Sequence, residues 1–298
     1  MKLTCVTAVF NAIKSGNGEN LVRCIRSVAS LKTQHEHLVY DGGSTDGTVE
    51  ILKKLRDEDN IAGLRFVSEP DTGIYNALNK GVRDAKGEWF YVLGCDDYIG
   101  KPKVMDDLIA KADSTVDVIA TPVKVDGIKG NYVIFADFKK LKNLFFTAVC
   151  CHQGEIARTR LVRLLGGFDE RYRISADTNM FLLARLRNAK FNYEMRDFAV
   201  FTMGGTASSN EDCYKREDAE LVARALNLTE AQMERLKTRR VLPIPLTVKL
   251  MFHRNFVVRM AARTVIWMYL RPIVRFFSCP LIVATRPLRL RLLKAKQA

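Results

Sequence analysis

The chain has 298 residues, 48% hydrophobic and 27% charged, which is enough for one large α/β domain with an extension. Its formal net charge of +14 is unevenly distributed: residues 235–298 contain 15 Lys and Arg and no acidic residue, which leaves 32 of the 47 basic residues against all 33 acidic residues in residues 1–234. A near-neutral main part excludes a uniformly basic nucleic-acid-binding domain, and the cationic tail is a separate feature.

The N-terminal part of the chain alternates between strand and helix patterns. Apolar strands are expected at residues 3–10, 37–40, 64–67 and 89–93. Polar, glycine-containing loops follow the first three strands. Amphipathic helices follow those loops, the first ending near residue 31, the second covering residues 49–55 and the third starting at residue 74. This alternation is typical of βαβ units and predicts a mostly parallel sheet flanked by helices.

The strand at Trp89–Leu93 is the centre of this prediction. It is apolar throughout, as expected for a central strand covered on both faces, and Asp96 and Asp97 follow it at the rim where open α/β sheets bind ligands. Two adjacent carboxylates repel each other unless a cation neutralises them, and oxygen ligands suit Mg²⁺ or Mn²⁺. A solvated turn is the alternative, because Asp is common in turns.

After Asp97 the alternation is less regular. A helix is expected at residues 103–112, and strands at residues 116–125 and 131–138 are expected to form a hairpin. A second helix is expected to start at residues 175–177. A late strand is expected at residues 191–203, followed by a polar loop at residues 204–209 and two further helical patterns.

The segment Asp41–Thr48 directly follows a predicted strand and contains three glycines among hydroxyl and carboxylate side chains. Glycine lets the backbone approach a ligand closely, and an Asp at a strand end can accept a hydrogen bond from a base N–H or a ribose hydroxyl. The segment matches neither the dinucleotide-binding fingerprint nor the P-loop. A tight turn between strand and helix, capped by Ser44 or Thr45, is the alternative.

Taken in order, these segments resemble the inverting glycosyltransferases of family 2, which have the GT-A fold. The resemblance covers roughly residues 1–210. Its blocks are the strand ending in Asn11, Asp41–Thr48, Asp71–Gly81, Asp96–Asp97, His152–Gln153, Gly166–Asp169, Ser175–Asp177 and Gly204–Gly205. The combination is similar to bacterial enzymes that build O-antigen, capsule or exopolysaccharide repeat units.

The resemblance implies a nucleotide-sugar site in which Asp41 holds the uracil or ribose, with Phe10 and Asn11 lining the same pocket. His152 and Gln153 correspond to a pair that faces the donor sugar or the acceptor, although a lone His more often has a structural role. The residues that the resemblance assigns to the nucleotide-sugar are Phe10, Asn11, Asp41, Asp71, Asn79, Asp96, His152 and Gln153.

For Asp96 and Asp97 the resemblance implies that one carboxylate contacts the ribose or sugar and the other a Mn²⁺ or Mg²⁺ ion on the diphosphate. The sequence departs from the common Asp-x-Asp-Asp pattern, because Gly94 stands in the first acidic place. Which of the two acids ligates the metal therefore stays open.

Asp177 matches the catalytic base of the family. In a single displacement the acceptor hydroxyl loses its proton as it attacks the anomeric carbon, and a carboxylate within hydrogen-bond reach can accept that proton. A simple N-cap of the following helix is the alternative role for this side chain.

Two further features have structural interpretations. His35 and His37 flank Glu36 on one face of a strand, and without additional zinc ligands we interpret them as surface residues. Seven cysteines, an odd number with no CxxC pair, in a chain without a recognisable secretory signal favour a reducing cytosol.

The tail combines basic and apolar residues. Residues 246–271 place most of their Lys, His and Arg on one broad helical face and apolar and aromatic residues elsewhere, as in helices that lie in a membrane interface. The charge-free stretches are much shorter than the ~20 residues of a spanning helix, so no transmembrane helix is expected. At about 1 kcal/mol per basic residue near an anionic leaflet, residues 246–298 are predicted to bind an anionic membrane surface. RNA binding is a weaker alternative, since no RNA-binding module is recognisable.

The sequence therefore predicts a GT-A-type α/β domain at residues 1–215, a helical connector at 216–242 and a cationic, amphipathic tail at 243–298. The expected activity is metal-dependent, inverting transfer of a sugar from a nucleotide-sugar, with UDP-sugar favoured, to a glycan on a polyprenyl-diphosphate lipid. The expected location is the cytoplasmic face of a bacterial inner membrane, as a peripheral protein. The alternatives are a nucleotidyltransferase that makes nucleotide-sugars, and a non-catalytic membrane scaffold. Nucleic acid is not an expected partner.

Overall fold

The computed structural model describes residues 1–126, 132–134, 151–202, 210–225 and 229–231. All of these belong to the first of two compact units, residues 1–240, and the second unit is residues 241–298. The predicted loop at 204–209 and the predicted tail lie outside the described residues.

The main sheet has the strand order β10-β6-β9-β4-β1-β2-β3. Its strands are β1 (Leu3–Val9), β2 (His35–Asp41), β3 (Leu64–Ser68), β4 (Trp89–Val92), β6 (Val118–Ala120), β9 (Glu155–Arg158) and β10 (Phe191–Tyr193). β1 is parallel to β2 and β4, β2 to β3, and β10 to β6, whereas β9 runs antiparallel between β4 and β6. The predicted mostly parallel sheet is confirmed.

A smaller sheet has the order β5-β11-β7-β8. Its strands are β5 (Tyr98–Ile99), β7 (Val123–Asp126), β8 (Tyr132–Ile134) and β11 (Ala199–Thr202). The antiparallel pairing of β7 with β8 confirms the predicted hairpin partners. The described α-helices are α1 (Gly18–Ala29), α2 (Thr48–Lys53), α3 (Ile74–Asp84), α4 (Pro102–Lys111), α5 (Thr159–Leu164), α6 (Ala176–Leu186) and α8 (Glu211–Ala225).

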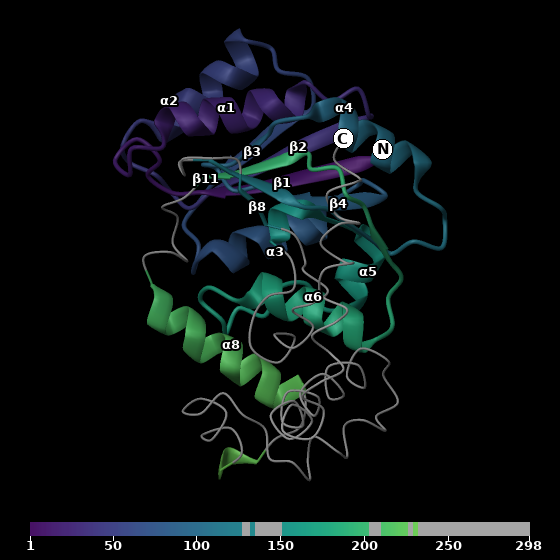
Figure 1. The fold of residues 1–298 in the computed structure, drawn as a ribbon. Coiled ribbons are helices and arrows are strands. Elements are labelled where there is room, and N and C mark those ends of the chain that lie inside the picture. The colour runs from purple at the N-terminus through teal and green to yellow at the C-terminus, as the bar shows by residue number, and fades with distance from the viewer. Residues whose placement is uncertain (127–131, 135–150, 203–209, 226–228, 232–298) are drawn as a thin grey trace, which may run out of the picture. The chain divides into compact units, whose positions relative to one another are not determined.

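Helices cover both faces of the main sheet (Figure 1). Along β4, Phe90 packs into the core cluster that includes residues of α3, α5 and α6, whereas Trp89 and Tyr91 pack into the cluster that includes residues of α1 and α4. Alternate side chains of one strand thus fill two cores, as the period of a strand requires. This confirms that β4 is a central strand buried on both faces.

Two predicted strands are wrong as single strands. The segment 116–125 is interrupted at Pro122, which has no N–H for a ladder, and yields β6 in the main sheet and β7 in the smaller one. The segment 191–203 divides in the same way into β10 and β11. Both segments leave one sheet and join the other, which their apolar pattern does not reveal.

His37 corrects the expectation of a surface residue. It is buried, and its Nε2 lies 2.9 Å from Thr7 Oγ1 inside the domain. Burial lowers the pKa of His37 to about 3, so the imidazole is neutral. His37 is therefore a core residue that pairs with a hydroxyl on the neighbouring strand.

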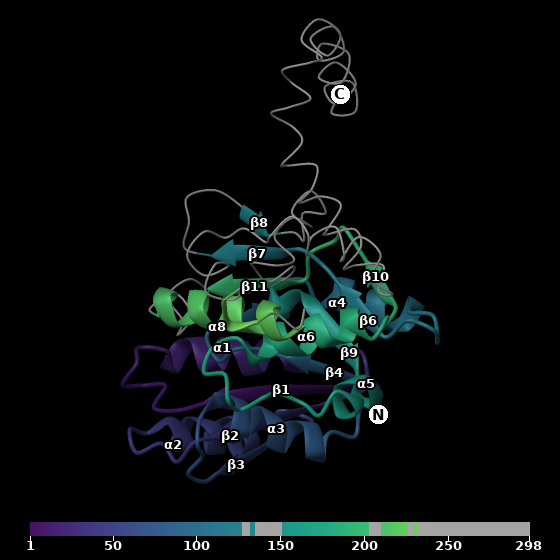
Figure 2. The ribbon, with the colours of Figure 1, turned by 90° about the horizontal axis from the view of Figure 1, so that it is seen from below.

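Among the described residues, no helix has both the length and the apolar content needed to cross a membrane. The predicted domain boundary at residue 215 falls inside α8, which contacts α6 of the main domain. Figure 2 shows α8 lying alongside α6.

Candidate active site

The candidate residues of the first half follow four strands that end at the same edge of the sheet. Asn11 follows β1, Asp41 ends β2, Asp71 follows β3 and Asp96 follows β4. Since β1 runs parallel to β2 and β4, and β2 to β3, their carboxyl ends meet there. The site is therefore built at the edge that binds ligands in open α/β sheets.

The Asp41 carboxylate organises the loop that follows β2. It is buried, and it accepts hydrogen bonds from the backbone N–H of Gly43 at 3.1 Å and of Ser44 at 2.9 Å, and from Ser68 Oγ at 2.6 Å. The Ser44 hydroxyl donates to its other oxygen. Asp41 thus fixes the shape of the loop in which the sequence predicts a nucleotide pocket.

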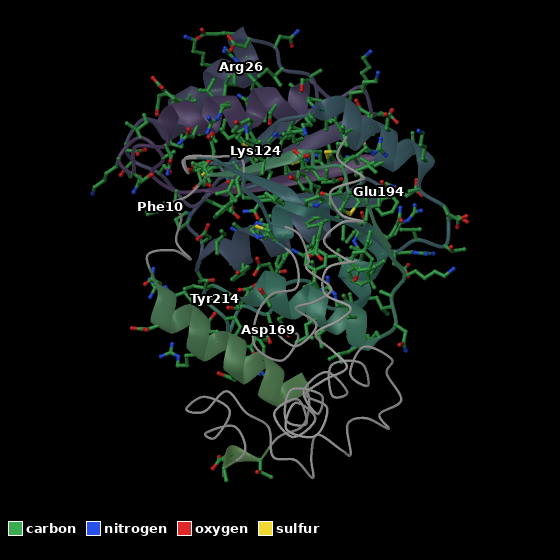
Figure 3. The ribbon with its side chains drawn as sticks, in the orientation of Figure 1. Phe10, Arg26, Lys124, Asp169, Glu194 and Tyr214 are labelled. Carbon is green, nitrogen blue, oxygen red and sulfur yellow. The ribbon has the colours of Figure 1, made fainter. Side chains whose placement is uncertain are left out.

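Three predicted residues converge beside this loop. A Cβ placed on Gly42 would lie 2.9 Å from Asp71 Oδ2 and 3.3 Å from Phe10 Cδ2, so both side chains lie directly against the Gly42 backbone. Phe10 is 62% exposed, and its label in Figure 3 lies at the rim of the domain. Asn11 accepts a hydrogen bond from the backbone N–H of Thr45 at 3.0 Å. An exposed ring, a carboxylate and a glycine backbone therefore lie side by side next to the Asp41 loop.

The two acids after β4 have different surroundings. Asp97 is 1% exposed, and its Oδ1 accepts a hydrogen bond from the N–H of Thr202 while its Oδ2 accepts one from Gln153 Nε2, both at 2.8 Å. Asp96 is half-buried, and its main-chain carbonyl accepts the Thr202 hydroxyl at 2.8 Å. The protein therefore holds the Asp97 carboxylate with two donors, one on each oxygen.

The same surroundings raise the pKa of both acids. Burial is the largest cause for Asp96 and for Asp97, and the neighbouring Asp96 charge adds to it at Asp97, whose pKa rises to about 6. Two carboxylates kept close together in a buried place repel each other, and the cation that the sequence predicts between them stays a prediction.

Gly94, the residue that departs from the Asp-x-Asp-Asp pattern, lies directly against the two carboxylates that follow it. A Cβ at this position would lie 2.6 Å from Asp97 Oδ2 and 2.9 Å from Asp96 Oδ1. An acidic side chain at residue 94 would have to displace the two carboxylates that are present.

Asp177 lies in the first turn of α6, after the N-cap residue Ser175. Its Oδ2 is 2.8 Å from His152 Nδ1, and its Oδ1 accepts a hydrogen bond from the N–H of Thr178 at 2.8 Å. The side chains of His152 and Asp177 are 27% and 20% exposed, so both reach solvent. Asp177 is not the N-cap, and its carboxylate forms an ion pair at the edge of a cavity lined by Phe90, Phe168 and Met180.

The pair shifts the two pKa values in opposite directions. Burial alone would raise the pKa of Asp177. The hydrogen bond and the charge of His152 lower it, together with smaller contributions from other donors, and the net shift of the Asp177 pKa is downward. Burial lowers the pKa of His152, but the hydrogen bond and charge of Asp177 raise it, and the net shift is upward. Asp177 is therefore ionised at neutral pH.

One short turn connects the two groups of acids. His152 and Gln153 are adjacent in a 3-10 turn (His152–Gly154), where His152 contacts Asp177 and Gln153 contacts Asp97. The Tyr91 hydroxyl on β4 donates to the Gln153 carbonyl at 2.9 Å and anchors the turn to the central strand. Asp177 is thus brought to the same end of the sheet as the acid pair.

The structure places Tyr75, which the sequence prediction missed, next to Asp177, and it gives the predicted nucleotide-sugar residue Asn79 other partners. The Tyr75 hydroxyl donates to the Ile174 carbonyl and lies 3.3 Å from Asp177 Oδ1; its place inside the Asp71–Gly81 block was the available signal. Asn79 instead bonds the Phe168 carbonyl at 2.8 Å and Glu170 Oε1 at 2.7 Å, so its amide supports the loop before α6.

A cation site made by the protein alone is not present in the described residues, where no three His, Cys, Asp or Glu side chains converge. Mg²⁺ in proteins is commonly held by one or two carboxylates together with substrate phosphates. Asp96 and Asp97 match that donor set.

The chain is similar to known glycosyltransferases. The family model described as glycosyl transferase family 2 matches residues 4–158. An uncharacterised glycosyltransferase of Mycobacterium tuberculosis is 28% identical over 193 residues, spanning 62% of this chain and 69% of that protein. Chondroitin synthase of Pasteurella multocida is 28% identical over 213 residues, spanning 69% of this chain and 22% of that protein.

Two solved structures share the fold. TarS 1–349 of S. aureus in complex with UDP has a TM-score of 0.59 at 23% identity and covers 80% of this chain and 70% of that one. A mannosyltransferase of Pyrobaculum calidifontis in complex with GDP-Man and Mn²⁺ has a TM-score of 0.54 at 14% identity and covers 92% and 87%. The predicted GT-A-type α/β architecture is confirmed.

Proposed function

The chain belongs to glycosyltransferase family 2 and is a sugar-transferring enzyme, and on that premise we propose that it moves a sugar from a nucleotide-sugar to a hydroxyl group in one inverting displacement that requires a divalent cation. The favoured donor is a UDP-sugar. Family membership argues against a nucleotidyltransferase or a non-catalytic scaffold.

The observation that carries the proposal is the turn His152–Gly154. His152 Nδ1 lies 2.8 Å from Oδ2 of the predicted base Asp177, and Gln153 Nε2 donates to Oδ2 of Asp97 at 2.8 Å. An inverting displacement needs a base on one side of the anomeric carbon and charge stabilisation of the leaving diphosphate on the other. The turn supports this division of roles, because it contacts the base Asp177 on one side and, on the other, Asp97, the direct neighbour of Asp96.

Asp177 accepts the proton of the acceptor hydroxyl. It is ionised, part of its side chain reaches solvent, and two donors fix its orientation, the His152 imidazole and the Thr178 N–H. Because the His152 pKa is raised, the imidazole is a proton donor to Asp177 and keeps its second oxygen in place. One carboxylate with fixed partners is sufficient for general base catalysis.

Asp96 presents the carboxylate that we assign to Mn²⁺ or Mg²⁺ and the diphosphate. Both oxygens of Asp97 already accept protein N–H groups, which leaves Asp96 as the acid better placed to reach a ligand. A bound divalent cation would stabilise the charge that develops on the departing diphosphate. The nucleotide is surrounded by Phe10, Asn11, Asp41 and Asp71. The glycine backbone at residue 42 lets the nucleobase approach the Asp41 loop.

The donor class is tested by thermal unfolding of the protein with UDP-, GDP-, CDP- and dTDP-sugars, each with Mn²⁺ or with EDTA. We expect UDP-sugars with Mn²⁺ to raise the melting temperature most, because a ligand at 100 times its Kd adds about 2.7 kcal/mol to the free energy of unfolding. TarS is known in complex with UDP and with UDP-GlcNAc, and the Pyrobaculum enzyme with GDP-Man, so a GDP-sugar is the informative competitor. Stabilisation by GDP-sugars alone would reject the UDP assignment, and stabilisation by none would reject the donor site.

The acceptor is a glycan on a polyprenyl-diphosphate lipid, as in bacterial surface polysaccharide synthesis. This part of the proposal rests on the sequence of residues 246–298, which lie outside the described residues. Their basic and aromatic side chains would keep the enzyme at the cytoplasmic face of the inner membrane, where such an acceptor is found.

Truncation after Leu242 is expected to abolish binding to vesicles that contain anionic lipid, because it removes 11 of the 15 basic residues of the C-terminal segment. Co-sedimentation of the full chain and the truncated chain with anionic and with neutral vesicles measures this. Binding of a donor sugar, followed by thermal unfolding, is the control for an intact main domain. Equal sedimentation of both chains would show that the tail is not the membrane-binding segment.

A further inference from the structure

Glu217 on α8 is a buried carboxylate that reaches the segment before α6. Its side chain is buried, with 6% of the residue exposed. Helix α8, which carries Glu217, packs beside α6 (Figures 1 and 2). None of the family motifs in the sequence includes Glu217. A buried acid is costly unless its charge is compensated, so its partners indicate what it does.

Three of those partners are consecutive backbone N–H groups, and the fourth is the Cys213 thiol, whose Sγ lies 3.5 Å from Glu217 Oε1. Glu217 Oε1 accepts a hydrogen bond from Arg173 N at 2.8 Å, and Oε2 accepts from Ile174 N and Ser175 N at 2.9 Å each. Burial alone would raise the pKa of Glu217, but these hydrogen bonds lower it by more. The net shift of the pKa is downward, so the carboxylate is charged at neutral pH. Successive N–H groups on an ionised oxygen form charge-assisted bonds, which are stronger than neutral ones.

The N-terminus of α6 has no side-chain hydrogen bond from its own N-cap residue. Ser175 occupies the N-cap position, yet its side chain makes no capping hydrogen bond, and its buried hydroxyl has no hydrogen-bond partner among the described residues. The three N–H groups bound by Glu217 directly precede the helix. The orientation of the first turn of α6 therefore depends on a side chain from another helix.

That first turn carries Asp177. The peptide groups next to Ile174 are held from two sides, since its N–H donates to Glu217 while its carbonyl accepts the Tyr75 hydroxyl. Asp177 is three residues further on, and its carboxylate must meet both His152 and the incoming hydroxyl. A small rotation of residues 173–175 would move the carboxylate out of both positions.

We propose that Glu217 is a positioning residue for Asp177: it clamps the backbone of residues 173–175 and so sets where the base stands. This inference rests on the proposed role of Asp177 as the base. It assigns α8, which lies beyond the family match at residues 4–158, a direct part in the geometry of the reaction.

The variant Glu217→Gln tests the clamp. The amide keeps one acceptor oxygen, but its NH₂ group faces backbone N–H donors, so the clamp is broken with little change in volume. We expect kcat to fall about 10- to 100-fold, as for a catalytic group displaced by a fraction of an ångström to an ångström. Donor affinity, measured by thermal shift with the sugar nucleotide that stabilises the unmodified protein, should be unchanged, and hydrogen exchange of the peptide covering residues 172–178 should accelerate.

Asp212→Asn is the matched control, because it removes the same charge from an exposed position on the same helix. Glu217→Asp is the second variant: it keeps the charge on a shorter side chain, and an intermediate kcat supports positioning. Wild-type kcat and wild-type exchange in Glu217→Gln would overturn the inference. A loss of donor affinity as large as the loss of kcat would also overturn it, since that pattern indicates general unfolding.

Failure of the underlying assignment gives a different result. If Asp177→Asn were as active as the unmodified enzyme, the base assignment would fall whatever Glu217 does. If Asp177→Asn is inactive and Glu217→Gln is fully active, only the clamp is rejected.

Discussion

Asp177→Asn should lower kcat by about 10²- to 10⁴-fold, the contribution expected of a positioned general base. Asn has nearly the same shape and keeps an oxygen for the Thr178 N–H, so the start of α6 should keep its structure. Donor binding should be unchanged, because the nucleotide pocket lies in the loops after β1 to β4. Initial rates at saturating donor and acceptor, with thermal shift for donor affinity, measure both quantities.

The alternative base is His152, because it also reaches solvent. His152→Gln removes the imidazole but leaves the carboxylate, and we expect it to lose clearly less activity than Asp177→Asn. Asp107→Asn on α4 controls for the loss of one charge at a half-exposed position. Equal losses in His152→Gln and Asp177→Asn, or more than a tenth of the activity left in Asp177→Asn, would contradict the assignment of the base.

The pair also predicts a pH dependence of stability. The lowered pKa of Asp177 gives a contribution to the free energy of unfolding that is present above its unfolded pKa, about 3.9, and lost as pH falls through the folded value. The raised pKa of His152 gives a contribution that is present below its unfolded pKa, about 6.5, and lost as pH rises through the folded value. The pair thus stabilises most between these limits. In Asp177→Asn the His152 pKa should fall, which NMR titration of the imidazole would detect.

The first half of the fold could be predicted because its information is local. Each of β1 to β4 contains an apolar stretch, a helix pattern follows β1, β2 and β3, and the run at Trp89–Leu93 is buried on both faces as its composition indicates. The second half could not be predicted as well, because β6, β7, β10 and β11 are three or four residues long. Their assignment to one sheet or the other depends on pairing between distant segments, and periodicity within each segment does not report it.

The candidate site divides in the same way. Asp96 and Asp97 were predictable because they follow a strand, and Asp177 because it stands in a family motif. Tyr75 and Glu217 act on the segment before Asp177 from positions 99 and 43 residues away in the chain. Glu217 stands in no family motif, and although Tyr75 lies inside the Asp71–Gly81 block, that block does not reveal its contact with Ile174. Both contacts exist only after α3, α6 and α8 have packed.

Asp96→Asn and Asp97→Asn should differ in kind, although the two acids are adjacent. Asp96→Asn removes the charge from the half-buried carboxylate, and we expect it to abolish the Mn²⁺-dependent stabilisation by the donor. Activity should fall by about 10²- to 10⁴-fold, because cation stabilisation of a leaving group is worth several kcal/mol and each 1.36 kcal/mol is tenfold in rate. Its free energy of unfolding without ligand should stay within about 0.5 kcal/mol of the unmodified value.

Asp97→Asn should instead destabilise the fold, because an amide at this position leaves a buried polar group without a partner, at a cost of about 1–3 kcal/mol. Removal of the charge that burial and Asp96 disfavour acts in the opposite direction, so the loss of stability should be smaller above about pH 6, where the Asp97 carboxylate of the unmodified protein is ionised. Both oxygens of Asp97 accept N–H groups, from Thr202 and Gln153, so an NH₂ group at either place faces another donor. Gln153 cannot relieve this by turning its amide without losing the hydrogen bond from Cys151 Sγ to Gln153 Oε1. Urea unfolding without ligand, and thermal shift with Mn²⁺ and the donor, separate the two effects. Two results would contradict this division of roles: equal losses of stability in both variants, or metal-dependent donor binding that Asp96→Asn retains. The division follows from the structure, because protein donors occupy both oxygens of Asp97 and Asp96 is left to meet the ligand.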